Sequence, residues 1–299
     1  MTRSRRLVVA LGLNAALVVG QLVFGVVSGS VGLLADAGHN LADTASVVIA
    51  LIAVRLSRRP PTPLHSYGYH RATILAALAN AVALLVVTVI IVFEAASRLA
   101  NPEPVRAGIV IVVALTATVV NLAAAWVLYE KRVDLNMRSA LLHMAADAGA
   151  SLGVAAAALV ILVTGSFLWL DSAVSIAIAV VIGFEGWKLV RSATDVLLEA
   201  TPADIDLTAL RAAMTHVHGV AAVHDLHVWS LSSGIRALSA HMVIEGSPSL
   251  EDAEAIGRQV KAAVGEAFTI SHSTLELEPI TPEGIQPGFE PDLERHVPD

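Results

Sequence analysis

The sequence predicts an α-helical membrane protein with six transmembrane helices followed by a small α+β domain. Of the 299 residues, 56% are hydrophobic and 15% are charged, whereas soluble proteins have about 45–50% and about 25%. Long apolar segments fill the chain up to about residue 195, and the mean hydropathy is +0.71. Acidic residues, histidines and alternating apolar positions follow. We therefore divide the chain into a transmembrane domain (1–199), an α+β domain (200–281) and a tail (282–299).

Six apolar segments are each close to the length of about 20 residues that a helix needs to cross a bilayer. They lie near 7–27, 32–54, 74–97, 108–129, 140–163 and 169–190. The first follows three arginines, as the apolar part of a signal peptide would, but it is too long for one and further spans follow it. We therefore interpret it as a retained first helix.

Positive charge indicates the topology of these helices. Arg98 and Arg106 lie on one side of the membrane if the helices alternate in direction. The other side carries a larger set: Arg3, Arg5, Arg6, Arg55, Arg58, Arg59, Arg71, Lys131, Arg132, Arg138, Lys188 and Arg191. Because cytoplasmic loops carry an excess of Lys and Arg, we expect a multi-pass protein of the inner (plasma) membrane with both termini in the cytoplasm.

The segment after Pro202 has the pattern of a soluble domain. Asp204 is the expected N-cap of a helix that ends near His216. Strands are predicted over 220–230 and 235–244, with Ser232-Ser233-Gly234 as the hairpin turn. A helix from Ser249 to about 267 and a strand over 271–278 complete an α-β-β-α-β order, which indicates two layers. Prolines and acids then predict a disordered tail over 282–299.

Two His-x-x-x-Asp pairs lie inside apolar segments, His39 with Asp43 and His143 with Asp147. Residues four apart share one face of a helix. An Asp in hydrocarbon costs about 2.5–3.5 kcal/mol on insertion scales, so such residues tend to mark functional sites. We expect the second and fifth helices to run in the same direction and to place both pairs at equal depth. Two imidazoles and two carboxylates would complete the tetrahedral shell that Zn²⁺ favours; structural hydrogen bonding is the alternative.

Three stretches carry a resemblance to a known family: Leu34–Asp43, Tyr67–Arg71 and the second His-x-x-x-Asp pair. They resemble the cation diffusion facilitator family, and within it the bacterial zinc, cadmium and cobalt exporters. The resemblance covers about residues 7–280. It implies a homodimer in the lipid bilayer that exchanges cytoplasmic divalent metal for external protons by alternating access. It also implies that His39, Asp43, His143 and Asp147 are the transport ligands, that Zn²⁺ is the first substrate with Cd²⁺ and Co²⁺ as others, and that no organic cofactor is needed.

Two further polar residues lie near His39 on the same helix. Asp36 is a candidate proton carrier, or a group that orients an imidazole, while helix capping or packing is the alternative. Asn40 is a weaker candidate for the same roles, because polar residues in membrane helices are often helix–helix contacts.

The link between the second and third helices contains His65 and His70, candidates for a loop metal site. Thr62 and Tyr69 stand where some relatives have an Asp and a His, which leaves that site incomplete. Arg71 and Glu199 resemble the family's interlock between the third helix and the linker to the soluble domain. Two separate surface charges are the alternative.

The α+β domain carries candidates for a regulatory metal, because the family uses corresponding positions between two cytoplasmic domains. His224 and His241 are expected on adjacent strands, and Glu276 and Glu278 on one face of the last strand. Exposed histidines without a ligand are the alternative. The full candidate set is His224, His227, His241, Glu254, His272, Glu276 and Glu278.

Several functions are disfavoured by what the sequence lacks. It has no cysteine and therefore no thiolate ligands, and a net charge of −7 without a basic stripe argues against nucleic acid. It has neither the His-Glu-x-x-His motif of a metallohydrolase nor a phosphate-binding loop for ATP. The sequence thus predicts a secondary active exporter of divalent metal, not an enzyme. The alternative is a membrane metal sensor that binds metal without transporting it.

Overall fold

The computed structural model describes residues 3–128, 135–232 and 234–280. Its contacts divide the chain into two compact units, Met1–Ala53 with Ala76–Arg191 and Val54–Leu75 with Ser192–Asp299. The tail predicted over 282–299 lies outside the described residues.

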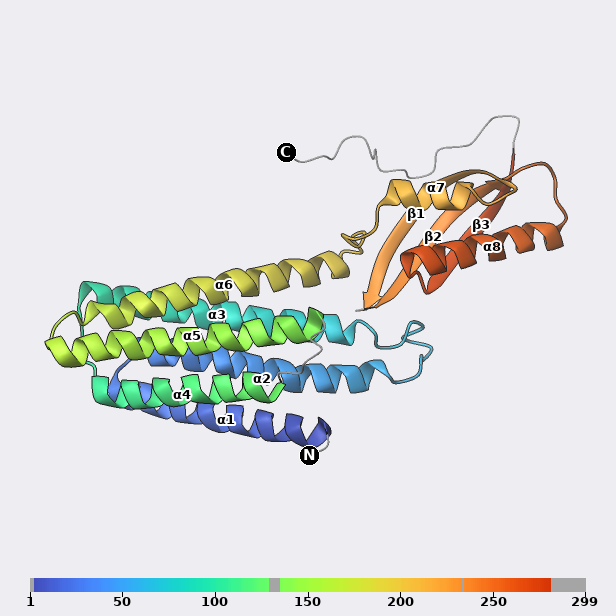
Figure 1. Cartoon of the computed structure of the whole chain (residues 1–299). Helices are drawn as coiled ribbons and strands as arrows, with labels where there is room; N and C mark the ends of the chain where they lie inside the picture. Colours follow the sequence, from blue (N-terminus) through green and yellow to red (C-terminus); the bar gives the residue numbers. More distant parts are fainter. Residues whose placement is uncertain (1–2, 129–134, 233, 281–299) are drawn as a thin grey trace. The chain divides into compact units, whose positions relative to one another are not determined.

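The first part of the chain forms the predicted series of six long helices (Figure 1). Over their described residues, five are long and apolar enough to cross a membrane, and the described apolar part of the first, Gly12–Ser28, is shorter. The six-helix prediction is therefore confirmed. The helices are α1 (Arg3–Ser28), α2 (Val31–Ser57), α3 (Ala72–Ala100), α4 (Ala107–Leu128), α5 (Leu135–Thr164) and α6 (Trp169–Leu197).

Small side chains form much of the core between these helices. Ala35, Ala95, Ala114 and Ala179 are fully buried in one apolar cluster that also includes Leu33. Lipid tails are as apolar as leucine, so membrane helices associate through close packing, which alanine permits. This packing fixes the beginning of α2, the helix that carries the first His-x-x-x-Asp pair.

A side chain from α6 caps the beginning of α2. Asp171 Oδ2 accepts hydrogen bonds from the backbone N–H of Val31 at 2.7 Å and of Gly32 at 3.3 Å. Ser30 Oγ donates to Asp171 Oδ1 at 2.5 Å and accepts from the N–H of Leu33 at 3.1 Å. The first N–H groups of a helix have no partner within the helix, and water cannot supply one in hydrocarbon. Asp171 therefore ties the start of α2 to α6.

The same turn is held from α3. Arg98 Nη1 donates to the carbonyl oxygen of Gly29 at 2.5 Å, and its guanidinium also pairs with Glu94 at 2.7 Å and Glu103 at 3.5 Å. Gly29 has a φ of +71°, a conformation that glycine adopts at little cost. Polar side chains from α3 and α6 thus fix the turn between α1 and α2.

Replacing Asp171 with alanine is expected to lower the thermal unfolding midpoint of the protein in detergent. The buried N–H groups of Val31 and Gly32 would lose their acceptor, and each buried group left without a partner costs about 1–3 kcal/mol. Far-UV circular dichroism during heating would follow the loss of helix. Asp195→Ala, an exposed carboxylate near the other end of α6, is the control and should leave the midpoint unchanged. Equal midpoints for both variants would contradict the capping role.

The C-terminal residues form the predicted α-β-β-α-β domain: α7 (Leu207–Thr215), β1 (Val220–Ser232), β2 (Ile235–Ile244), α8 (Leu250–Phe268) and β3 (His272–Pro279). The sheet has the order β1-β2-β3, with β1 antiparallel to β2 and β2 parallel to β3. A parallel neighbour needs a long crossover, and α8 supplies it. Helices and sheet enclose a separate core: Leu210, Met214, Leu238, Met242, Val260 and Val264 are fully buried.

One detail of this domain differs from the prediction. The N-cap of α7 is Asp206, which accepts from the N–H of Thr208 at 2.8 Å and of Ala209 at 3.3 Å. Asp204 was expected there, but it lies two residues too early and instead accepts a hydrogen bond from Arg236 Nη2 at 2.7 Å. That guanidinium hydrogen bond holds the pKa of Asp204 below its ordinary value. The sequence Asp204-Ile205-Asp206 contains two possible N-caps. Asp206 is the cap because α7 begins at the next residue, Leu207.

Candidate metal sites

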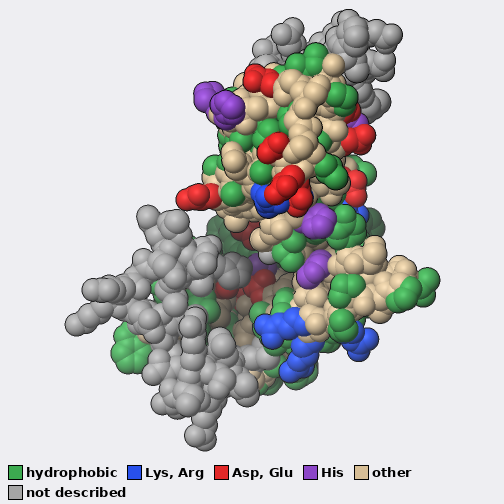
Figure 2. All heavy atoms as spheres, turned by 90° about the vertical axis from the view of Figure 1, so that its right-hand side faces the viewer, with side chains coloured by type: hydrophobic (Ala, Val, Ile, Leu, Met, Phe, Trp, Pro, Cys, Tyr) green, Lys and Arg blue, Asp and Glu red, His purple; other side chains and the backbone are tan. Residues whose placement is uncertain are grey.

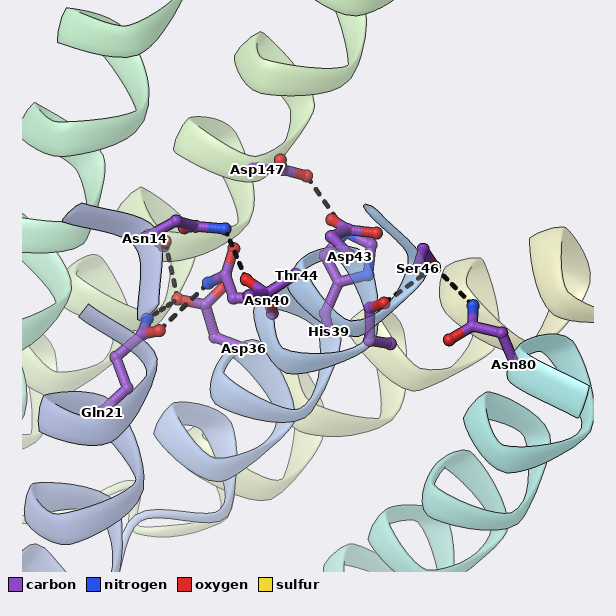
Figure 3. A network of polar contacts seen from close by, with 12 residues as sticks. Asn14, Gln21, Asp36, His39, Asn40, Asp43, Thr44, Ser46, Asn80 and Asp147 are labelled. Atoms are coloured by element: carbon purple, nitrogen blue, oxygen red, sulfur yellow. Dashed lines mark hydrogen bonds and ion pairs between the residues drawn. The ribbon is translucent and has the colours of Figure 1, made fainter. Parts of the chain in front are cut away.

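Three of the four predicted transport ligands converge between α2 and α5 (Figure 3). His39 Nε2 lies 3.0 Å from Asp147 Oδ1 and 3.7 Å from Asp43 Oδ2. Ligand atoms of these three residues all lie within 4.8 Å of one another. One divalent cation between them would be bound by an imidazole nitrogen and two carboxylate oxygens, a donor set that Zn²⁺ accepts.

His143, the fourth predicted ligand, lies on α5, but its side chain is outside those that the structure describes. It precedes Asp147 by four residues, so the two positions share one face of the helix.

The expected common direction of the two helices is wrong, because α2 and α5 are antiparallel (Figure 1). His39 pairs with Asp147, while the earlier Asp36 of α2 accepts a hydrogen bond from the later Ser151 of α5. Three turns separate α2 from α5, and each reverses the chain direction. Both pairs meet because each lies in the first half of its own helix, toward the middle of the bundle.

Burial of α2 changes abruptly at this site. Between Val31 and Asn40 every residue is buried except the half-buried Leu34 and Gly38, whereas Leu41 is exposed and Asp43 half-buried. The side chains of His39 and Asp147 are 10% and 9% exposed, against 33% for Asp43. The site is therefore closed toward the α1–α2 turn and more open toward the end of α2 that leads to the Pro-rich link, the segment between α2 and α3 that contains Pro60, Pro61 and Pro63.

A buried polar network surrounds His39 on the closed side (Figure 3). Asp36 Oδ2 accepts hydrogen bonds from Gln21 Nε2 at 2.6 Å and from Ser151 Oγ at 2.7 Å. Gln21 Oε1 in turn accepts from Asn40 Nδ2 at 3.0 Å. Side chains of α1, α2 and α5 are thus linked, and the role predicted for Asp36 and Asn40 stays a prediction.

A second group of polar contacts lies beyond Asp43. Asn14 Nδ2 donates to Thr44 Oγ1 at 2.9 Å, and Asn80 Nδ2 donates to Ser46 Oγ at 2.5 Å (Figure 3). They join α2 to α1 and to α3 on the more open side of the site.

Sequence reasoning did not single out Ser151 or Asn80. Ser151 follows Asp147 by four residues, so a search along the ligand-bearing face of α5 would have found it. Asn80 carries no such signal, because its partner Ser46 lies 34 residues away on another helix.

The α+β domain contains the second ligand group found among the described residues. His224 and His241 lie on the adjacent strands β1 and β2, as predicted. They are directly paired there, and their ring centroids lie 5.2 Å apart. Glu278 accepts from both: Oε2 lies 3.0 Å from His224 Nε2, and Oε1 lies 2.7 Å from His241 Nδ1. Burial raises the pKa of Glu278, but the hydrogen bonds from His224 and His241 outweigh it and hold the pKa below its ordinary value. The ionised carboxylate and two imidazoles fit Zn²⁺.

Two acidic residues face the other ring nitrogen of His241. Its Nε2 lies 3.5 Å from Glu276 Oε2 and 3.6 Å from Asp225 Oδ2. Sequence reasoning missed Asp225, because strict alternation along β1 would place it on the face opposite His224. A register irregularity between His224 and His227, with a φ of +50° at Asp225, turns it toward His241. An Asp inside a predicted strand, where this residue is depleted, was the available signal.

The other candidates in this domain lie outside the cluster of His224, His241 and Glu278. His227 Nε2 pairs with Asp225 Oδ1 at 3.0 Å, and Glu254 pairs along α8 with Arg258 at 2.8 Å. His272 makes an edge-on ring contact with Tyr67, with centroids 5.8 Å apart. Acidic side chains are the prominent charged groups on the face of this domain that Figure 2 turns to the viewer.

The link between α2 and α3 shows no complete ligand group among its described residues. His65 stacks on Tyr69, with centroids 4.5 Å apart, and its Nδ1 lies 3.4 Å from Thr62 Oγ1. The structure brings neither His65 nor His70 into a group of three ligand side chains. Arg71 and Glu199, the predicted interlock, do meet: Nη2 lies 2.6 Å from Oε1. Both side chains are more than one third exposed, so water screens the pair.

A six-helix membrane bundle with a cluster of His and Asp side chains, followed by an α+β domain with a His and Glu cluster, is the architecture of a membrane transporter of metal cations. Family models match in the same order: the cation efflux transmembrane domain over residues 7–198 and the cation efflux protein cytoplasmic domain over residues 202–280. The chain belongs to the cation efflux family, which confirms the resemblance drawn from the sequence. Members of this family are transporters, not enzymes.

Individual relatives of this chain are also metal cation transporters by name. The chain is 36% identical over 280 residues to the zinc transporter ZitB of Escherichia coli (strain K12), covering 92% of this chain and 87% of that protein. It is 33% identical over 261 residues to the cadmium, cobalt and zinc/H(+)-K(+) antiporter of Bacillus subtilis (strain 168), covering 86% and 83%. It is 34% identical over 277 residues to the metal cation efflux system protein CzcD of Cupriavidus metallidurans, covering 92% and 86%.

Proposed function

We propose that this protein exports Zn²⁺ from the cytoplasm in exchange for protons, by alternating access of one site formed by His39, Asp43, His143 and Asp147. The observation that carries the proposal is the convergence of His39, Asp43 and Asp147 in the middle of the membrane domain. Imidazole and carboxylate ligands suit borderline metals, and Cd²⁺ and Co²⁺ are further substrates; all-oxygen sites favour Mg²⁺ or Mn²⁺. Relatives named as zinc transporters and as a cadmium, cobalt and zinc antiporter support this choice.

The exchange follows from the acid–base chemistry of the ligands. Zn²⁺ binds neutral imidazole and ionised carboxylate, so its binding displaces protons and protonation displaces the metal. A site that opens first to one side and then to the other therefore couples the two flows. The short His39–Asp147 distance, 3.0 Å, is one that a proton can bridge when the metal has left.

The topology gives the exchange its direction. With both termini in the cytoplasm, the α1–α2 turn lies on the outer side and the Pro-rich link on the inner side. The closed, capped end of α2 then seals the outer side, and the more open end beyond Asp43 faces the cytoplasm. We assign the described arrangement to the inward-facing state, in which Zn²⁺ reaches the site from the cytoplasm; the exposure of Asp43 supports this assignment.

The C-terminal domain is assigned a regulatory role in a homodimer. The family model that matches it is a cytoplasmic dimer domain, which supports the second copy. Metal on His224, His241 and Glu278 would leave a coordination position open, because these residues supply three of the four ligands that Zn²⁺ favours. A partner domain or water would fill that position.

Proteoliposomes with an acid interior test the exchange directly. External Zn²⁺ is added to the wild-type protein, and internal zinc and internal pH are recorded together with two dyes. We expect zinc uptake with simultaneous alkalinisation of the interior, abolished by a protonophore that collapses the gradient. Zinc binding by the folded protein without any uptake would contradict export and support the sensor alternative. Uptake without a pH change would contradict proton exchange alone.

A further inference from the structure

The hydrogen bonds of Asp36 are distributed unequally between its two oxygens. Oδ2 accepts from both Gln21 Nε2 and Ser151 Oγ, whereas Oδ1 is buried and has no hydrogen-bond partner among the described residues. The whole residue is 0% exposed. A buried oxygen without a partner costs much more when the carboxylate is ionised than when it is a neutral acid. The neutral acid places its carbonyl oxygen, Oδ2, against both donors and its hydroxyl on Oδ1.

The surroundings of Asp36 favour the neutral form. Asp36 accepts directly from the amide of Gln21 and the hydroxyl of Ser151, and Gln21 in turn accepts from the amide of Asn40. None of these three side chains is cationic. An uncompensated buried charge in hydrocarbon is costly, and two neutral hydrogen bonds do not replace a counter-ion. The titratable groups that act on Asp36 through their charge are His39 on α2 and Asp147 on α5, and the contact from the described side chains of α1 is the hydrogen bond of Gln21.

We infer that Asp36 is a proton-binding site separate from the four proposed metal ligands, protonated on Oδ1 when the metal site is empty and ionised when a divalent cation binds. This inference rests on the proposed function and extends it. Asp36 lies one helical turn before His39 on α2, so a cation at the proposed site acts on it through its positive charge. On metal binding the Oδ1–H bond breaks, the electron pair stays on the carboxylate, and the proton leaves to the aqueous side to which the site is then open.

The inference explains why the network spans three helices. Gln21 on α1 and Ser151 on α5 donate hydrogen bonds to the carbonyl oxygen of Asp36. Asn40, the residue after His39 on α2, donates to Gln21. When Asp36 ionises, both hydrogen bonds strengthen, because bonds to charged groups are roughly twice as strong as neutral ones. Metal binding at His39 thereby tightens the contact of α2 with α1 and α5.

Calorimetric titration of the full-length protein with ZnCl₂ tests the assignment, in detergent and in several buffers of different ionisation enthalpy. The dependence of heat on the buffer gives the number of protons released per zinc bound. We expect Asp36→Asn to release about one proton fewer than wild type, with an affinity loss smaller than the about 10–100-fold that removing a group bonded to a metal ligand costs. Asp171→Asn, which removes another buried carboxylate of the membrane domain, should release the wild-type number.

Infrared difference spectra supply a readout that a merely structural role would not change. In wild type, adding Zn²⁺ should remove a carbonyl band of a protonated carboxylic acid, and Asp36→Asn should lack that band. If Asp36→Asn does not fold, Ser151→Ala serves instead: loss of its hydrogen bond to the carbonyl oxygen should shift the band to higher frequency.

The outcomes separate the two proposals. If the wild-type protein binds zinc and Asp36→Asn releases the same number of protons, the assignment of Asp36 is overturned and the proposed function stands. The same holds if the wild-type protein binds zinc but shows no carbonyl band that shifts in Ser151→Ala. A folded wild-type protein that binds no zinc would overturn both.

Discussion

Replacing Asp147 with alanine is expected to reduce zinc uptake into proteoliposomes at least about 100-fold, since loss of groups that only support metal ligands already costs about 10–100-fold. Asp147 Oδ1 lies 3.0 Å from His39 Nε2 and belongs to the group whose ligand atoms lie within 4.8 Å of one another. The alanine variant removes one carboxylate, and with it one of the negative charges that offset a divalent cation. Uptake is measured at equal protein density with an imposed pH gradient.

Two further variants separate the ligand role of Asp147 from packing. Asp147→Asn keeps the size of the side chain and removes its charge, and uptake should fall as far as in the alanine variant. Glu94→Ala removes an exposed carboxylate of the membrane domain that pairs with Arg98, and uptake should stay at the wild-type rate. Full proton-coupled flux in Asp147→Asn would show that this residue is not a transport ligand.

The helices and strands were predictable because each one has its own periodic or apolar signal. Six apolar segments predicted the six helices, and alternating positions predicted β1 and β2 with His224 and His241 on adjacent strands; their direct pairing comes from the register. The caps were less predictable. Ser249 caps α8 as expected, since Asp252 donates its N–H to Ser249 Oγ at 3.2 Å, but Asp206 replaces Asp204 at α7.

The unpredicted parts of the site depend on contacts between distant residues. Asp171 caps α2 from 140 residues away, and Ser151 reaches Asp36 from 115 residues away. No local pattern encodes such pairs. The bulge that turns Asp225 toward His241 is likewise a property of how β1 pairs with β2, and alternation alone predicts the opposite face. The direction of α5 relative to α2, by contrast, followed from counting turns and was available from the sequence.

Simultaneous replacement of His224 and His241 with alanine is expected to raise the zinc concentration for half-maximal transport about tenfold, while the maximal rate stays near that of wild type. His224, His241 and Glu278 form a ligand group within one domain, at a distance in the chain from the transport site. A ligand shifts a conformational equilibrium only through its differential affinity for the two states. Under the proposed function, metal bound at this cluster favours the productive state of the dimer, and loss of its ligands shifts the concentration dependence and not the transport step.

The double variant His216→Ala with His218→Ala is the matched control, because both histidines are exposed and lie before β1 rather than in the sheet. It removes the same number of imidazoles and should leave the half-maximal concentration unchanged. Glu278→Gln tests the same cluster with less change in packing: its loss of charge should weaken metal binding, since the ionised carboxylate is the form that its two histidine partners favour. The cluster is structural if transport depends on zinc concentration identically in three proteins: wild type, the double variant His224→Ala with His241→Ala, and Glu278→Gln. A regulatory site that loses its ligands must change the zinc dependence of transport.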